Sequence, residues 1–73
     1  MATFSVEPGK VHEHSHNFAA RTVLLAGSAD LVVGGKKQRL EIGASVTIPP
    51  MVSHTVINTG PLDVTVACRR ADS

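Results

Sequence analysis

Apolar residues alternate with polar ones along most of this 73-residue chain, and this period of two constrains its fold more than any other feature. Side chains two positions apart share one face of a β-strand, whereas a helix repeats every 3.6 residues. The alternating segments are short and rich in Val, Ile, Leu and Thr, and they cover residues 20–27, 28–34, 38–42, 45–49, 52–59 and 62–70. No window shows a capped helical stripe, so the pattern predicts an all-β sandwich or barrel.

Tight turns are predicted between these segments. Gly34 and Gly35 separate two of them and supply the positive φ angles that a two-residue hairpin needs. Gly60 and Pro61 mark a second turn. The chain has no linker, repeat or low-complexity tract, so we expect a single domain over residues 1–73.

The small size of the chain limits the hydrophobic core that it can build. A chain of this length buries only about 60% of its unfolded surface, and its stability is correspondingly marginal. Cys68 is the only cysteine, so no disulfide can form within the chain. A bound metal ion or self-association is then the expected source of additional stability.

Composition argues against two classes of partner. The net charge is +1 with the histidines neutral, and the only aromatic residues are Phe4 and Phe18. Nucleic-acid binding needs a concentrated basic face and aromatic side chains for stacking, so we expect no nucleic-acid partner. No apolar run approaches the roughly 20 residues that span a bilayer, so we expect no membrane partner. The N-terminus lacks the pattern of a signal peptide, which favours a cytoplasmic location.

Residues 20–26 are apolar on both faces of their predicted strand, with Leu24 on one face and Val23 and Leu25 on the other. In so small a protein, the second apolar face predicts that another subunit covers it, and we expect a homodimer. The last segment instead has one inward face, formed by Leu62, Val64, Val66 and Cys68. Cys68 is therefore interpreted as a small core residue rather than as a nucleophile.

Three of the four histidines, His12, His14 and His16, occupy every second position. On a strand they would share one face, with neighbours roughly 7 Å apart along the chain. Two such imidazoles can converge on one metal ion, and His54 brings a third from a later segment. A row of three histidines spans roughly 13–14 Å, so all three can bind one ion only if the strand bends.

The histidine spacing resembles the first motif of the cupins, a family of small double-stranded β-helix, or jelly-roll, barrels. That motif runs Gly, five residues, His-x-His, three or four residues, Glu, six residues and Gly. The stretch GKVHEHSHNFAARTVLLAG has four residues between Gly9 and His14, then His16, three residues, Ala20, six residues and Gly27.

The second cupin motif, Gly, five residues, Pro-x-Gly, two residues, His, three residues and Asn, is matched more closely. The stretch GASVTIPPMVSHTVIN has Gly43, Pro49, His54 and Asn58 at the family's spacing, with Met51 in place of the glycine. The resemblance covers roughly residues 8 to 68, and it implies an all-β cupin barrel.

The resemblance implies that His14, His16 and His54 are metal ligands in the mouth of the barrel. The family's glutamate ligand is replaced by Ala20, which removes a negative charge and leaves a coordination position to be filled. Whether His12 fills that position or lies exposed at the mouth stays open. The expected pocket lining is Met51, Phe18 and Ala20.

Neutral imidazole ligands favour a divalent transition metal, namely Fe, Ni, Zn, Cu or Mn, and three functions fit such a site. One is a metal-dependent enzyme, dioxygenase-like or isomerase/lyase-like, acting on a small molecule. Another is a non-catalytic module that binds a metal or small ligand, and the third is a structural barrel whose site has decayed. The fold does not choose among them, and the sequence assigns no catalytic acid or base. An enzyme leaves at least two coordination positions open, whereas a binding module can fill them with protein ligands.

Overall fold

The computed structural model describes residues 2–71, which contain eight strands and no helix. The strands are β1 (Ala2–Val6), β2 (Val11–His14), β3 (Ala20–Ala26), β4 (Ala29–Val33), β5 (Lys36–Leu40), β6 (Ser45–Ile48), β7 (His54–Asn58) and β8 (Val64–Arg70). Met1 and residues 72–73, the two ends of the expected domain, lie outside the described residues. Residues 2–71 accordingly offer no helix long and apolar enough to cross a bilayer.

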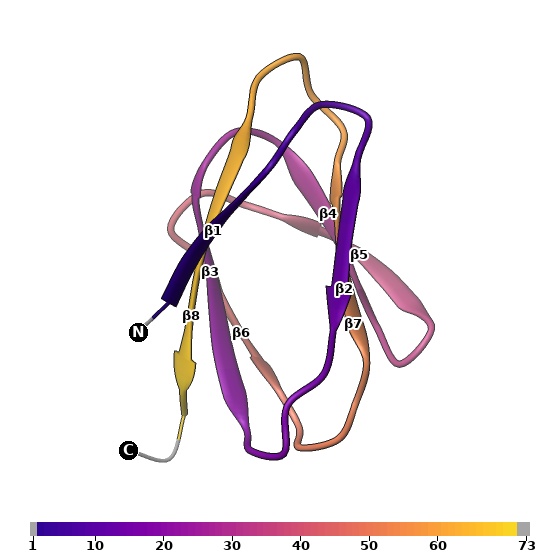
Figure 1. The fold of residues 1–73 in the computed structure, drawn as a ribbon, viewed down its shortest axis with the longest axis vertical. Coiled ribbons are helices and arrows are strands. Elements are labelled where there is room, and N and C mark those ends of the chain that lie inside the picture. Colours follow the sequence, from indigo (N-terminus) through magenta and orange to yellow (C-terminus); the bar gives the residue numbers. More distant parts are fainter. Residues whose placement is uncertain (1, 72–73) are drawn as a thin grey trace.

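The strands form two four-stranded sheets that face each other (Figure 1). The first sheet has the order β1-β8-β3-β6 and the second has the order β2-β7-β4-β5. All the paired strands are antiparallel. Several neighbouring strands, such as β1 and β8, are distant in the sequence. The prediction of an all-β sandwich or barrel is confirmed.

The core lies between the two sheets and is built from every second residue of the strands. Its buried members are Val6, Leu24, Ala29, Leu31, Leu40, Val56, Val64 and Val66, with Phe4, Val33 and Val46 packed against them. The predicted inward face of the last strand is confirmed for Val64, Val66 and Cys68. It is wrong for Leu62, which is 71% exposed because β8 begins only at Val64 and Leu62 belongs to the preceding turn.

The strand boundaries differ from the expectation mainly at three places, and at one of them β5 covers Lys36–Leu40 instead of residues 38–42. Residues 2–6 form β1 along β8, a strand that the alternating pattern did not predict. The histidine row is not one straight strand, because β2 ends at His14 and His16 lies in the connection to β3. The predicted hairpin is confirmed, since Gly34 and Gly35 have φ angles of 54° and 84° between β4 and β5.

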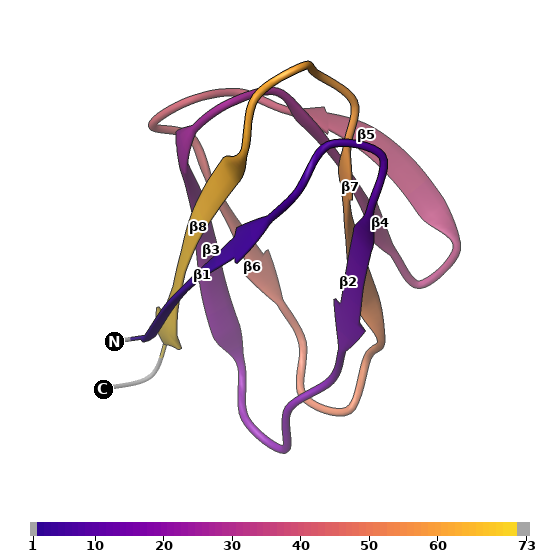
Figure 2. The same cartoon turned by 45° about the horizontal axis from the view of Figure 1, so that its top comes forward.

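The connections between strands gather at the two ends of the sandwich (Figures 1 and 2). The β2–β3 and β6–β7 connections meet at the lower end, where the Met51 N–H donates a hydrogen bond of 2.7 Å to the His16 carbonyl. Met51 has a φ of 67°, in the left-handed region that favours glycine. Glycine is the residue that the second cupin motif has at this position. The two histidine motifs are therefore brought together by the topology and joined by this bond.

Gly27→Ala is expected to destabilise the fold far more than Gly35→Ala. Both glycines have positive φ, 92° and 84°, which costs a non-glycine residue about 1–2 kcal/mol. A Cβ on Gly27 would lie 2.8 Å from the Asp63 carbonyl oxygen, whereas one on Gly35 meets nothing within 4 Å. Overpacking adds about 1–3 kcal/mol at Gly27 alone. Urea unfolding of both variants measures the difference, and equal losses would contradict the steric argument.

Candidate metal centre

His14 and His54 are direct partners across the β2–β7 pair, at the lower end of the second sheet. Their ring centroids are 4.5 Å apart and the rings are nearly perpendicular, at 89°. His54 is 2% exposed. The His14 Nε2 and the His54 Nδ1 are buried without a hydrogen-bond partner. Since buried polar atoms are normally paired, these two nitrogens mark a place where a further group would be stabilised.

His12 lies beside this pair and holds the orientation of His14. Its Nε2 is 2.8 Å from the His14 Nδ1, and its ring stacks on Phe4 with centroids 4.2 Å apart. When His14 donates its Nδ1 proton to His12, its Nε2 is unprotonated and can bind a metal ion. This contact would fix the ring orientation of His14 in the way that outer hydrogen-bond partners do at metal sites.

His16 comes from the β2–β3 connection and is fixed by stacking and by its backbone. Its ring stacks on Phe18 with centroids 4.7 Å apart, and the Arg70 guanidinium lies 4.9 Å from the Phe18 ring centroid. The bond from Met51 holds its carbonyl. The His14 and His16 rings lie 4.5 Å apart, so the bend after His14 brings them closer than an extended strand would.

Cys68 is the site residue that the sequence analysis did not assign. It lies on the inward face of β8, 8% exposed, with its Sγ 3.6 Å from the His16 Nε2 and 3.9 Å from the Thr22 Oγ1. The ligand atoms of His14, His16 and Cys68 all lie within 4.8 Å of one another, and His54 is not part of this group. The inward parity of Cys68 was visible in the sequence, whereas its closeness to His16 depends on strand register.

Burial keeps the central histidines neutral. The pKa of His54 is lowered from 6.5 to about 4, first by desolvation and then by the nearby imidazoles of His14, His16 and His12, while a backbone hydrogen bond at Val52 acts in the opposite direction. Desolvation also lowers the pKa of His14, with smaller contributions from His16 and His12. Neutral imidazole is the form that could bind a metal ion, so both side chains would be available for it at neutral pH.

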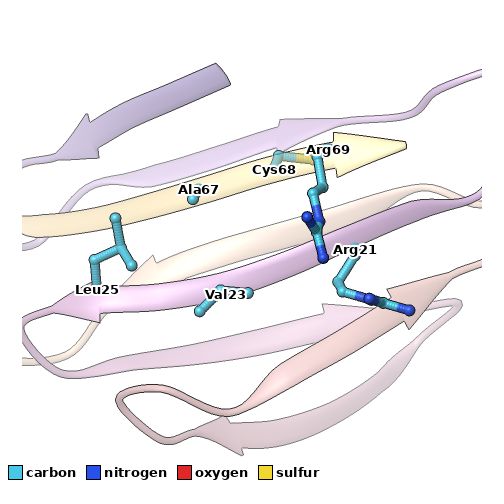
Figure 3. A pocket seen from close by; sticks show the side chains of 6 residues that line it. All are labelled: Arg21, Val23, Leu25, Ala67, Cys68 and Arg69. Atoms are coloured by element: carbon cyan, nitrogen blue, oxygen red, sulfur yellow. The ribbon is translucent and has the colours of Figure 1, made fainter. Parts of the chain in front are cut away.

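The three residues expected to line a pocket differ in their exposure. Met51 is 76% exposed, Ala20 is fully buried, and Phe18 is half-buried against His16. One hollow lies on the outer side of the first sheet, lined by Arg21, Val23, Leu25, Ala67, Cys68 and Arg69 (Figure 3).

Asn58, which ends the second motif, has a structural role. Its side-chain amide donates to the carbonyls of Val6 and Leu62 at 2.8 Å, and its Oδ1 accepts the Gly60 N–H at 2.9 Å. It therefore ties β1 to the turn before β8. Glu13 is exposed and accepts hydrogen bonds from Ser53 and Thr55.

The chain belongs to the cupin family, because the family model for the cupin domain matches residues 2–68. No curated protein matches the chain. The resemblance stated from the two motifs is confirmed.

Similar solved structures confirm the double-stranded β-helix. A de novo designed double-stranded β-helix shares 20% identity at a TM-score of 0.80, with 93% of this chain and 94% of that chain covered. A predicted oxalate decarboxylase from Thermotoga maritima shares 22% at 0.77, with 90% of this chain but only 59% of that chain covered. The cupin domain of an XRE family transcriptional regulator from Enterobacter cloacae shares 17% at 0.79, covering 90% and 73%. Likenesses at these identities concern the fold alone.

The stability of the metal-free protein is expected to fall as the pH drops from 6.5 toward about 4. In this window an unfolded chain binds a proton at His54, near the ordinary pKa of 6.5, while the folded chain does not. Protons therefore favour unfolding, and the lowered pKa of His14 acts in the same direction. Urea midpoints at about pH 7.5 and about pH 5, measured with a chelator present, test this. His54→Gln should reduce the difference, and a pH-independent wild-type midpoint would contradict the burial argument.

Proposed function

We propose that this cupin binds one divalent transition-metal ion through His14, His16, His54 and Cys68. The observation that carries the proposal is the pair of unpartnered buried nitrogens, on His14 and His54, beside the imidazole and thiol of His16 and Cys68. An unpaired buried polar atom costs about 1–3 kcal/mol, and a metal ion would satisfy both atoms at once.

The separation between His16 and Cys68 fits two ligands of one ion. With metal–nitrogen and metal–sulfur distances of about 2.0–2.1 Å and about 2.3 Å, two tetrahedral ligands lie about 3.6 Å apart. The Sγ and Nε2 atoms are 3.6 Å apart. A thiolate would also supply the negative charge that was lost with glutamate at Ala20. Sulfur is a soft ligand, which within the expected divalent metals favours Zn and Fe.

This ligand set favours a binding module over an enzyme. Three imidazoles and one thiolate fill a tetrahedral shell, and sites with four protein ligands hold a metal ion rather than activate water or substrate on it. The function proposed is therefore to bind and retain the metal ion.

A second candidate is an open, catalytic site, and one observation favours it. His54 is not within the 4.8 Å group formed by His14, His16 and Cys68, so three donors without His54 would leave a coordination position free. A bound ion would then act as a Lewis acid or in oxygen chemistry on a small molecule. His12 would be the nearest further group able to carry a proton. A decayed site would instead refuse metal altogether.

Untagged protein is expected to contain about one equivalent of a transition metal per chain, measured by elemental analysis. His54→Ala should weaken metal binding far more than His12→Ala does, since it removes a ligand. His12→Ala should weaken binding by only about tenfold to a hundredfold, because it removes a support of a ligand. Equal losses in the two variants would favour four histidine ligands. Protein that is empty and refuses added metal would overturn the proposal.

Cobalt(II) reports directly on the proposed sulfur ligand. The cobalt-loaded protein should show an intense near-ultraviolet thiolate-to-cobalt charge-transfer band and tetrahedral visible bands. Cys68→Ser should lose the charge-transfer band while still binding cobalt more weakly, because three imidazoles remain. Cobalt bound in the wild type with this band but in a five-coordinate geometry would favour the open, catalytic site. Cobalt bound without this band would exclude Cys68 as a ligand and overturn the proposed ligand set.

A further inference from the structure

The outer face of the first sheet carries two positive charges and no negative one. Strand register and burial place ten residues of its four strands on this face, namely Thr3, Ser5, Arg21, Val23, Leu25, Ser45, Thr47, Thr65, Ala67 and Arg69. Its centre is a hollow with an apolar floor (Figure 3). The strand register places hydroxyl residues on both sides of it, on β1 and on β6. The face is thus apolar at its centre and polar at its rim, as protein interfaces are.

Two like charges lie side by side at one end of this face. Arg21 and Arg69 are direct partners across the β3–β8 pair, an arrangement that is destabilising without an anion between them. Among the described residues, neither forms an ion pair with a carboxylate. Figure 3 shows both side chains at the same end of the hollow, with Leu25 at the other.

The other end of the face is acidic and apolar. Glu41 and Asp63 are exposed there, next to Ile42 and Leu62, which are 64% and 71% exposed. Ile42 forms a bridge with Leu24 near the end of β3, which places the β5–β6 connection beside that end. Figures 1 and 2 show this connection projecting past the first sheet near its upper end.

Asp63 directly precedes β8, and its carbonyl lies close to Gly27, just after β3. Both carboxylates therefore flank the end of the face that is opposite to the arginines.

We propose that this face binds a second copy of the chain about a two-fold axis near Val23 and Ala67. The β3 strands of the two copies then run antiparallel across the interface. Arg21 and Leu25 lie about 13 Å apart along β3, on either side of Val23. Arg21 of one copy therefore faces the Leu25 end of the other. Each arginine pair then meets the Glu41 and Asp63 end of the partner copy, and the same contact forms twice. Such a self-complementary surface is what a two-fold dimer requires.

Other occupants fit this face less well. The hollow is too open to enclose a small molecule, which binding sites normally bury by about 70–90%. An acidic partner protein would pair with the arginines but would oppose Glu41 and Asp63. A stable dimer takes about 800 Å² per partner. That is roughly a fifth of the 4315 Å² surface, so the contact would extend over most of the face and its acidic end.

Two charge-reversed variants test the proposal by mixing. Arg21→Glu with Arg69→Glu, and Glu41→Lys with Asp63→Lys, should each weaken the dimer at least tenfold, because like charges then face each other. Sedimentation at micromolar concentration should show a wild-type dimer and two largely monomeric variants. A one-to-one mixture should recover the dimer, because both contacts of the mixed pair again join opposite charges.

The control is Lys10→Glu with Lys36→Glu, which reverses two charges away from this face and should leave the dimer intact. Circular dichroism checks that each variant folds. Where a double variant does not fold, the single variants Arg69→Glu and Asp63→Lys take its place. A monomeric wild type would overturn the proposal. So would variants that stay dimeric, or monomeric variants whose mixture does not recover a dimer.

Discussion

The cross-strand pair of His14 and His54 is the contact on which the lower end of the molecule depends. It places two imidazoles in the interior of a small apolar sandwich and leaves one nitrogen of each without a partner. Such groups cost free energy unless something satisfies them. In a 73-residue chain with no disulfide that cost is a large fraction of the total stability. A metal ion bound only by the folded state would offset the cost and stabilise the fold by mass action.

The geometry that gathers the remaining donors is set by two connections rather than by a strand. The chain leaves β2 after His14, and the Met51 N–H then holds the His16 carbonyl. This bond accompanies a left-handed backbone at Met51, where a side chain is disfavoured. The Met51 side chain is largely exposed, so its packing contributes little in return. The backbone conformation at this position therefore serves to join the two motifs, and the side chain does not.

The sequence predicted the parts of this structure that repeat every two residues. Alternation located six of the eight strands, and inward parity identified Val64, Val66 and Cys68 correctly. It did not identify β1, in which only Phe4 and Val6 face the core, nor the outward turn at Leu62. The contact between His16 and Cys68 joins residues 52 positions apart and follows from the register of β8 against β3. A pattern along one strand contains no such register, which is why the motifs led to the histidines and missed the sulfur.

The strands β3 and β8 contribute to both the candidate metal centre and the outer face of the first sheet, because successive side chains point to opposite faces. On β8, Cys68 points toward the histidines while its neighbours Ala67 and Arg69 point outward, and on β3 the same alternation separates Thr22 from Arg21 and Val23. A chain this small needs more than its own core to be stable, and metal binding and self-association are the two remedies that remain without a disulfide. In the β3–β8 pair, the inward face carries Cys68 for the proposed metal binding, and the outward face carries the residues for the proposed self-association. Because Cys68 is held between two outward residues, covering the outer face would also restrict the strand that presents its sulfur to His16.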